Sequence, residues 1–370
     1  MTRRRFDFDL LRAVFMFGVI YLHTAAPYLR DLSNRPVWEF SNLLACFFTP
    51  AVPLFFMMSG ALLLGSDRTL ELDYLMKKRL PRLLVPLCAY SALALLLQAA
   101  LGNAAGAADG LWKVFNTPVL VPYWFLYALI PMYLISPFLR LMARQMDDRL
   151  WNFLMGLWLF TRLLYTLRLF TPFRVQVILT EQWEFNLNFI GGYLGYFLLG
   201  AWLDRRESVP SRGVLLAGTA AALAAAARGP RWDTLRLGEY SSRFTDYRGL
   251  FTVVLSALLF LLARSLFRER EGGGGVPVLL TGNSMAVYLL HPLVLGAWER
   301  LWPRLTGGTP ASVPAQAALW LAVCLTCVGA AAVCASLPGL CYPLTGQSFR
   351  EACRGSNLQA LFSGKGPADP

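Results

Sequence analysis

The feature that most constrains this chain is a succession of apolar runs, each about as long as a membrane core is thick. A helix needs roughly 20 apolar residues to cross that core. The chain is 56% hydrophobic and 15% charged, with a mean hydropathy of +0.48, which lies outside the range of ordinary soluble domains. We therefore predict an all-α integral membrane protein, a bundle of about ten transmembrane helices. The predicted crossings are residues 10–29, 40–64, 80–101, 120–139, 150–168, 187–203, 212–228, 249–267, 281–302 and 315–342.

The formal net charge of +12 comes from basic residues that stand between the apolar runs. Lys and Arg in such positions orient membrane helices, and their distribution predicts that both termini are cytoplasmic. No folded soluble part presents a basic face, so nucleic acid is not expected as a partner. Residues 1–343 are predicted to form the membrane domain, and residues 344–370, rich in Gly, Ser and Pro, a disordered cytoplasmic tail. One feature that this orientation does not explain is the charge of the predicted external loop at 229–248, which holds Arg231, Arg236, Arg243 and Arg248.

The first predicted crossing keeps ionisable side chains that a helix needing only to cross lipid would not contain. Arg12 and His23 point the same way on a helix, because eleven residues make about three turns, or roughly 16 Å. Turning an ionised side chain toward lipid costs roughly 2.5–3.5 kcal/mol. We therefore predict that one stripe faces protein or a water-filled cavity and carries a function. This stripe consists of Asp9, Arg12, Met16, Val19 and His23.

The chain contains two histidines, and each lies within a predicted crossing. Both helices are predicted to run from inside to outside, which places His23 and His291 at a similar depth. Ser284, Tyr288 and His291 follow at i, i+4 and i+7 and form a second polar stripe. A neutral imidazole is a natural general base for removing the proton of a sugar hydroxyl. The alternative for each histidine is a structural hydrogen bond to a neighbouring carbonyl.

A basic cluster, Lys77-Lys78-Arg79-Leu-Pro-Arg82, leads into the third predicted crossing. It fits anchoring at the cytoplasmic face of the membrane. It also fits a phosphate clamp, because Arg79 and Arg82 stand at i and i+3 of a helix start and guanidinium groups bind phosphates bidentately. Cys324-Leu-Thr-Cys327 has the spacing of some metal sites, but it lies in an apolar stretch rich in small residues. We expect helix packing there and no metal.

Two further motifs lead to a family resemblance. Ser59-Gly60 ends the second crossing with small residues that permit close backbone approach. Tyr123-Trp124-Phe125 fits an interfacial aromatic belt, which is the favoured interpretation of Tyr123. The chain resembles acyltransferase family 3 from about Arg5 to Leu337. The resemblance is carried by Phe8-Asp9-Leu-Leu-Arg12, His23, Phe55-Phe56-Met-Met-Ser59-Gly60, Arg79-Leu-Pro-Arg82 with Pro86, Tyr123-Trp124-Phe125-Leu126, Gly200 closing the sixth crossing, and Ser284 with Tyr288-Leu-Leu-His291.

Members of that family are integral-membrane enzymes that move acyl groups, usually acetyl, from coenzyme A to hydroxyls of extracytoplasmic glycans. The resemblance implies that His23 is catalytic and that Arg79 and Arg82 bind coenzyme A. It also implies that acyl-CoA is a co-substrate, that no cofactor is bound, and that the other partners are membrane lipids and a glycan or lipid-linked sugar acceptor. Independently of the resemblance, we expect substrate-binding roles for further residues, with Tyr288 and His291 either binding the acceptor or stabilising the oxyanion. These residues are Asp9, Arg12, Ser59, Trp124, Tyr288 and His291.

The chain is similar to the short members of the family, such as those that acetylate enterobacterial common antigen, which lack an appended hydrolase-like domain. A multi-pass location in the bacterial inner membrane is expected. The sequence leaves open whether His23 acts as a general base or as a transient acyl carrier. It also leaves the acyl chain, the acceptor and the oligomeric state undetermined.

The competing function is a transporter or flippase in which the two histidines form a proton relay. Inverted repeats would predict matching broken helices in the two halves of the chain. The sequence shows none, so the enzyme is favoured.

Overall fold

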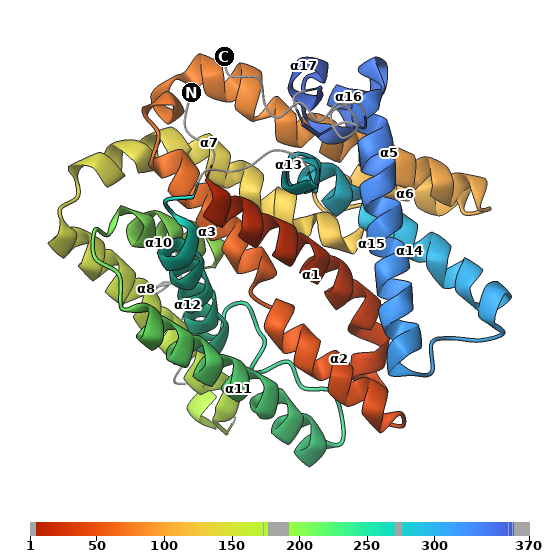
Figure 1. Cartoon of the computed structure of the whole chain (residues 1–370), viewed down its shortest axis with the longest axis horizontal. Helices are drawn as coiled ribbons and strands as arrows, with labels where there is room; N and C mark the ends of the chain where they lie inside the picture. Colours follow the sequence, from red (N-terminus) through yellow and green to blue (C-terminus); the bar gives the residue numbers. More distant parts are fainter. Residues whose placement is uncertain are drawn as a thin grey trace. The chain divides into compact units, whose positions relative to one another are not determined.

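The computed structural model describes residues 5–172, 174–176, 192–270, 276–353, 355, 356 and 358. Every regular element in these residues is a helix or a helical turn, which confirms the predicted all-α class (Figure 1). Eight helical stretches of this part of the chain are long and apolar enough to cross a membrane. The chain is therefore a multi-pass membrane protein, while the orientation of its termini stays a prediction. The eight stretches are Phe6–Arg30, Arg35–Leu64, Leu72–Ala100, Val121–Gln145, Asp148–Phe170, Arg212–Leu237, Leu250–Phe267 and Val313–Ser336.

Two of the predicted crossings are not among these stretches. The crossing expected at 187–203 begins outside the described residues, and its described part belongs to α10 (Tyr193–Arg205). The crossing expected at 281–302 falls on α14 (Ser284–Thr306), whose C-terminal half contains the charged residues Glu299, Arg300 and Arg304. The count of about ten crossings therefore rests on these two and stays a prediction.

The chain forms two compact units, and the division between them falls within two helices, α1 and α7. The first unit is Met1–Thr24, Glu71–Ile135 and Arg270–Pro370, and the second is Ala25–Leu70 and Ser136–Glu269. The first contains α1 (Phe6–Arg30) as far as Thr24, α4 (Leu72–Tyr74), η2 (Leu75–Arg79), α5 (Pro81–Ala100), α6 (Ala104–Lys113), η3 (Val121–Tyr123), α7 (Trp124–Gln145) as far as Ile135, α13 (Val276–Gly282), α14, α15 (Val313–Ser336), α16 (Pro338–Thr345) and α17 (Phe349–Ala352). The second contains the remainder of α1 and α7, together with α2 (Arg35–Phe48), α3 (Ala51–Leu64), η1 (Asp67–Leu70), α8 (Asp148–Phe170), α10, α11 (Arg212–Leu237) and α12 (Leu250–Phe267).

In the first unit, α15 contacts both helices that carry the histidines. It packs against α14 and α16, and both of these also contact α5 (Figure 1). Trp320 of α15 donates its indole N–H to the Phe17 carbonyl of α1 at 3.1 Å. The same indole meets the ring of Tyr21 edge-on, with 5.3 Å between the ring centroids. Helix α15 therefore holds α1 and α14, the two helices that carry the histidines.

The C-terminal part of the first unit is folded. The crossing predicted at 315–342 breaks at Pro338, which has no N–H to continue α15 and instead starts α16. Beyond α16, Ser348 and Glu351 form a capping box at the start of α17, in which each side chain accepts a hydrogen bond from the other residue's backbone N–H. The expectation of disorder is therefore wrong for residues 344–353. The rest of the predicted tail lies largely outside the described residues.

The crossing predicted at 40–64 is not one continuous helix. It consists of α2 and α3, which are separated at Thr49 and Pro50. Pro50 has no N–H to donate along a helix, and the Thr49 hydroxyl donates to the Ala45 carbonyl at 2.8 Å. One proline changes the mean hydropathy of a long apolar run very little, so the run did not reveal the break.

In the second unit, α3 and α10 pack with their backbones in contact. A Cβ atom on Gly60 would lie 1.8 Å from the carbonyl oxygen of Phe197, and one on Gly200 would lie 2.0 Å from that of Met57. No side chain fits at either position, which confirms the close approach predicted for Gly60. The expectation that Gly200 closes its helix is wrong, because α10 continues to Arg205.

The arginines of the predicted external loop have partners within the second unit. Burial alone would raise the pKa of Asp246, but hydrogen bonds from Arg248 and from the hydroxyl of Tyr165 lower this pKa below its ordinary value. Folding thus explains charges that the predicted orientation left unexplained. The contacts are Arg231 with Glu39 at 2.9 Å, Arg243 with Asp233 at 3.5 Å, Arg248 with Asp246 at 3.2 Å, and Arg236 over the ring of Trp232 at 5.3 Å.

Candidate active site

The two histidines meet in the first unit. The ring centroids of His23 and His291 are 5.2 Å apart, and the ring planes are tilted by 37°. His23 is half-buried on α1, whereas His291 is fully buried on α14. No group of three or more metal-ligating side chains is found in the described part of the chain. The two imidazoles, which were predicted to share a depth, are direct neighbours.

A proline explains the hydrogen bonding of His291. Pro292 has no N–H, so the Tyr288 carbonyl, four residues earlier, lacks the donor that a regular helix would supply. Nδ1 of His291 takes the place of that donor and binds this carbonyl oxygen. Because a carbonyl only accepts, Nδ1 carries the proton and Nε2 carries the lone pair. Nε2 is buried and has no hydrogen-bond partner among the described residues, so its capacity to accept a hydrogen bond is unused there.

Two tyrosines tie α14 to the turn that precedes α7. The Tyr123 hydroxyl donates to the Leu289 carbonyl at 2.8 Å, and the Tyr288 hydroxyl donates to the Pro122 carbonyl. The aromatic-belt interpretation of Tyr123 is therefore wrong, because this side chain is fully buried and hydrogen-bonded inside the unit. These bonds hold the part of α14 that leads directly to His291.

The polar stripe of α1 has the predicted arrangement. Nη1 of Arg12 lies 3.7 Å from Oδ1 of Asp9, one helical turn away. Asp9, Met16 and Val19 are 6%, 2% and 3% exposed, so this face of the helix is turned toward protein. Arg12 and His23 both lie on this face, about 16 Å apart along the axis.

The first unit also contains a basic cavity of about 310 Å³ at the start of α5, here called the α5 pocket. Both arginines of the predicted clamp line it. They do not share one α-helical turn as expected, because Arg79 ends the π-helical turn η2 and Arg82 lies in the first turn of α5. The ring of Tyr74 lies 5.4 Å from the Arg79 guanidinium. The complete lining is Tyr74, Lys78, Arg79, Arg82, Leu83, Tyr133, Met285, Thr345, Gly346 and Gln347.

One wall of the α5 pocket comes from residues that were predicted to form a disordered tail. Gly346 follows α16 with a φ of +71°, and a Cβ atom there would lie 2.6 Å from the Arg82 carbonyl oxygen. Arg82 also pairs with Glu351 at 2.6 Å. The capping box Ser348-Phe-Arg-Glu351 was the signal in the sequence that would have indicated this helix.

Helix α14 connects the α5 pocket with the histidine pair. Met285 lines the pocket, and His291 follows six residues later, about 9 Å along the helix axis. Helix α14 therefore fixes the axial spacing between one wall of the pocket and His291.

The positions of Trp124 and Ser59, two predicted substrate-binding residues, neither support nor contradict that prediction. Trp124 begins α7 directly after Tyr123 and is half-buried. Ser59 belongs to the second unit, on α3 beside Gly60. Their roles in substrate binding stay predictions.

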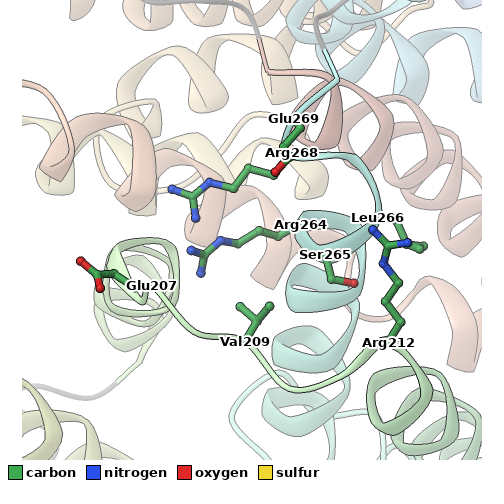
Figure 2. Close-up of a pocket in the computed structure, with 8 residues that line it drawn as sticks. All are labelled: Glu207, Val209, Arg212, Arg264, Ser265, Leu266, Arg268 and Glu269. Carbon is green, nitrogen blue, oxygen red and sulfur yellow. The ribbon is translucent and has the colours of Figure 1, made fainter.

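The second unit has an arginine-lined cavity of its own, about 210 Å³ in volume and here called the α12 pocket. Figure 2 shows Arg264 and Arg268 extending from α12 in one direction and Arg212 well apart from their ends, so the three guanidinium groups do not converge. Arg264 is buried and donates to the carbonyls of Leu203 and Arg206 at the end of α10. The complete lining is Glu207, Val209, Arg212, Arg264, Ser265, Leu266, Arg268 and Glu269.

A multi-pass helical fold with a pair of imidazoles near an arginine-lined cavity defines a membrane enzyme suited to a ligand that is anionic at one end. A family model described as an acyltransferase domain matches residues 5–337. The chain thus belongs to acyltransferase family 3 and is a membrane acyltransferase. No curated protein and no solved structure matches the chain. The similarity to the members that modify enterobacterial common antigen stays a prediction.

Proposed function

We propose that this membrane O-acyltransferase moves an acyl group, acetyl in the simplest case, from acyl-CoA to a hydroxyl of an extracytoplasmic glycan or lipid-linked sugar, in the inner membrane of a bacterium. The observation that carries the proposal is the contact between His23 and His291, in which Nε2 of His291 has no partner in the described part of the chain. Two adjacent imidazoles provide one group to accept a proton and another to orient the hydroxyl that loses it.

His23 is the general base in this proposal, because its half-buried ring is the more accessible of the two imidazoles. It removes the proton from the acceptor hydroxyl as the hydroxyl oxygen attacks the thioester carbonyl. The carbon–sulfur bond then breaks, and the leaving thiolate takes the proton from the His23 imidazolium. His291 orients the acceptor through a hydrogen bond to Nε2.

The α5 pocket is proposed to hold the phosphates of the donor. Arg79 and Arg82 present planar donors that match phosphate oxygens, and Lys78 adds a third positive charge. The acyl-bearing arm then runs along α14 from Met285 toward His291. The spacing of about 9 Å along that helix supports this route.

The test is an acetyl-transfer assay with the full-length protein in lipid nanodiscs, radiolabelled acetyl-CoA and a de-O-acetylated envelope polysaccharide. We expect His23→Ala to lose at least about 100-fold in thioester turnover, which is the lower range for removal of a general base. Coenzyme A binding and the thermal midpoint of the same variant serve as controls, and both should stay close to wild type.

Equal turnover in wild type and His23→Ala would exclude His23 as the base. Label retained on the wild-type protein, and absent from the variant, would instead assign His23 the role of an acyl carrier. Loss of folding in the variant would support a purely structural histidine.

A further inference from the structure

The C-terminal segment, here residues 345–353, 355 and 356, places a carboxylate on one of the arginines of the α5 pocket. Oε1 of Glu351 lies 2.6 Å from Nη2 of Arg82. Its other oxygen, Oε2, accepts hydrogen bonds from the backbone N–H and the hydroxyl of Ser348, at 2.9 and 3.0 Å. A carboxylate and a phosphate offer a guanidinium group the same kind of oxygen acceptor. Glu351 therefore occupies a donor that a ligand phosphate would need.

Several other polar contacts of this segment are made with the residues at the start of α14. The Gln347 amide donates to the Gly282 carbonyl at 2.6 Å and to the side-chain oxygen of Asn283 at 3.2 Å. The Asn283 amide in turn donates to the Ser356 carbonyl at 2.7 Å. The segment is thus anchored to the start of α14 by several neutral hydrogen bonds. Its ion pair with α5 is a separate and exchangeable contact.

The exposure of the ion pair makes such an exchange feasible. The side chains of Arg82 and Glu351 are 46% and 41% exposed, so a soluble anion can approach both of them. An exposed ion pair contributes little to stability. The segment also begins beyond residue 337, where the family match ends, so Glu351 lies outside the matched domain whereas Arg82 lies inside it.

We propose that the C-terminal segment is a lid on the α5 pocket, latched by Glu351 on Arg82, and that a phosphate group of the ligand opens it by replacing this carboxylate. The proposal rests on the proposed function of the α5 pocket as the phosphate site of the donor. A phosphate monoester carries up to two negative charges and more acceptor oxygens than a carboxylate, so it competes well for Arg82. An acyl-pantetheine fragment without phosphate does not compete, and the latch selects against it.

The test compares coenzyme A binding by wild type and Glu351→Gln, using full-length protein in nanodiscs and isothermal titration. Glutamine keeps the shape of the side chain and is accepted at this position of a capping box, so the variant removes the charge while retaining the helix. We expect the dissociation constant for coenzyme A to be about two- to fivefold lower in Glu351→Gln than in wild type. The change is small because an exposed ion pair contributes little free energy, and the ligand no longer has to break it.

A matched control is Asp73→Asn, which neutralises another exposed acid of the first unit. Asp73 pairs with Lys77 at 2.7 Å and does not line the pocket. Its dissociation constant should equal that of wild type. A gain as large as that of Glu351→Gln would reduce the effect to a general change in charge and overturn the latch.

Hydrogen exchange provides a second readout. Amide exchange of residues 348–353 in wild type should become faster when coenzyme A is added and should not respond to S-acetylpantetheine, which has no phosphate. Slower exchange with coenzyme A, or an equal response to the two compounds, would overturn the proposal.

The outcomes separate this proposal from the proposed function. If wild type binds coenzyme A and Glu351→Gln binds it no more tightly, the latch fails while the phosphate site stands. If neither protein binds coenzyme A, the phosphate site fails and the latch fails with it. Binding by Glu351→Gln alone would support both.

Discussion

The two arginine-lined cavities, one in each unit, use the same side chain in different ways. In the α5 pocket, Arg79 lies over an aromatic ring and Arg82 meets an exposed carboxylate. In the α12 pocket, Arg264 is buried, and both of its terminal nitrogens donate to backbone carbonyls. The number of arginines around a cavity therefore does not identify a ligand site. A ligand site is identified by the direction of the guanidinium N–H donors and by the partners that these donors already have.

The difference is explained by the kind of helix end that lies beside each arginine. The last carbonyls of a helix have no intrahelical donor, so they bind a side-chain donor where one is near. Arg264 supplies donors at the end of α10, and Arg140 does the same for the Leu64 carbonyl at the end of α3. Arg82 instead lies at the start of α5, where the free backbone groups are N–H donors and offer a guanidinium no acceptor. An arginine at a helix start thus stays available for an anion.

The largest effect expected from this comparison is on stability. Arg264→Met should lower the free energy of unfolding by about 2–4 kcal/mol, because one buried and one partly buried carbonyl lose their donors. Arg268→Met, at the exposed residue that directly follows α12, is the matched control and should change stability by less than about 0.5 kcal/mol. Thermal unfolding followed by tryptophan fluorescence in detergent measures both. Equal losses would show that Arg264 is not a structural cap.

The next effect is on ligand affinity. Arg79→Gln should weaken coenzyme A binding about tenfold or more, because charge-assisted hydrogen bonds to a phosphate contribute roughly 1.5–3 kcal/mol. Its thermal midpoint should stay unchanged, since Arg79 caps no helix end. Arg268→Gln removes an arginine from the α12 pocket and should leave coenzyme A binding as it is. If both variants lose affinity equally, the distinction between the two cavities disappears.

The smallest effect concerns an acid that holds a basic side chain of the second unit. The native pKa of Asp246 lies below its ordinary value of about 3.9. The stabilisation from its hydrogen bonds is therefore present above that pH and is lost as the pH falls through the native pKa. Asp246→Asn should lower stability at pH 7 by about 1 kcal/mol, and the gap to wild type should close below about pH 4.

Thermal midpoints of wild type and Asp246→Asn between pH 3 and pH 7 measure this gap. Glu239→Gln, an exposed acid in the same loop, is the control and should match wild type throughout. A gap for Asp246→Asn that does not change with pH would rule out the ionised carboxylate as its source.

Part of the candidate site could be predicted because its signals are local. Charged and imidazole side chains inside apolar runs are rare enough to mark a functional stripe, and helical periodicity places Arg12 and His23 on one face. Comparable positions on two helices predict a shared depth for His23 and His291, whereas their contact depends on how α1 and α14 pack. The loss of a helical donor at Pro292 could also be read from the sequence, because it requires only the identity of one residue.

Other features could not be predicted because they depend on segments that are distant along the chain. Tyr123 looked like an interfacial aromatic residue until the structure placed the Leu289 carbonyl beside it. Glu351 looked like part of a polar tail until folding placed it on Arg82. In both cases the residue type was compatible with two roles, and the partner decided between them.

The amino-acid sequence by itself determined that this is a helical membrane protein, which residues are ionisable at membrane depth, and the family to which the chain belongs. These properties follow from run length, residue type and short motifs, each of which acts over one or two helical turns. Only the tertiary structure decided which arginines cap helix ends and which line an open pocket, and what covers that pocket. The physical reason is that a guanidinium group binds whichever acceptor the fold brings to it, whether a backbone carbonyl, a carboxylate or a ligand phosphate.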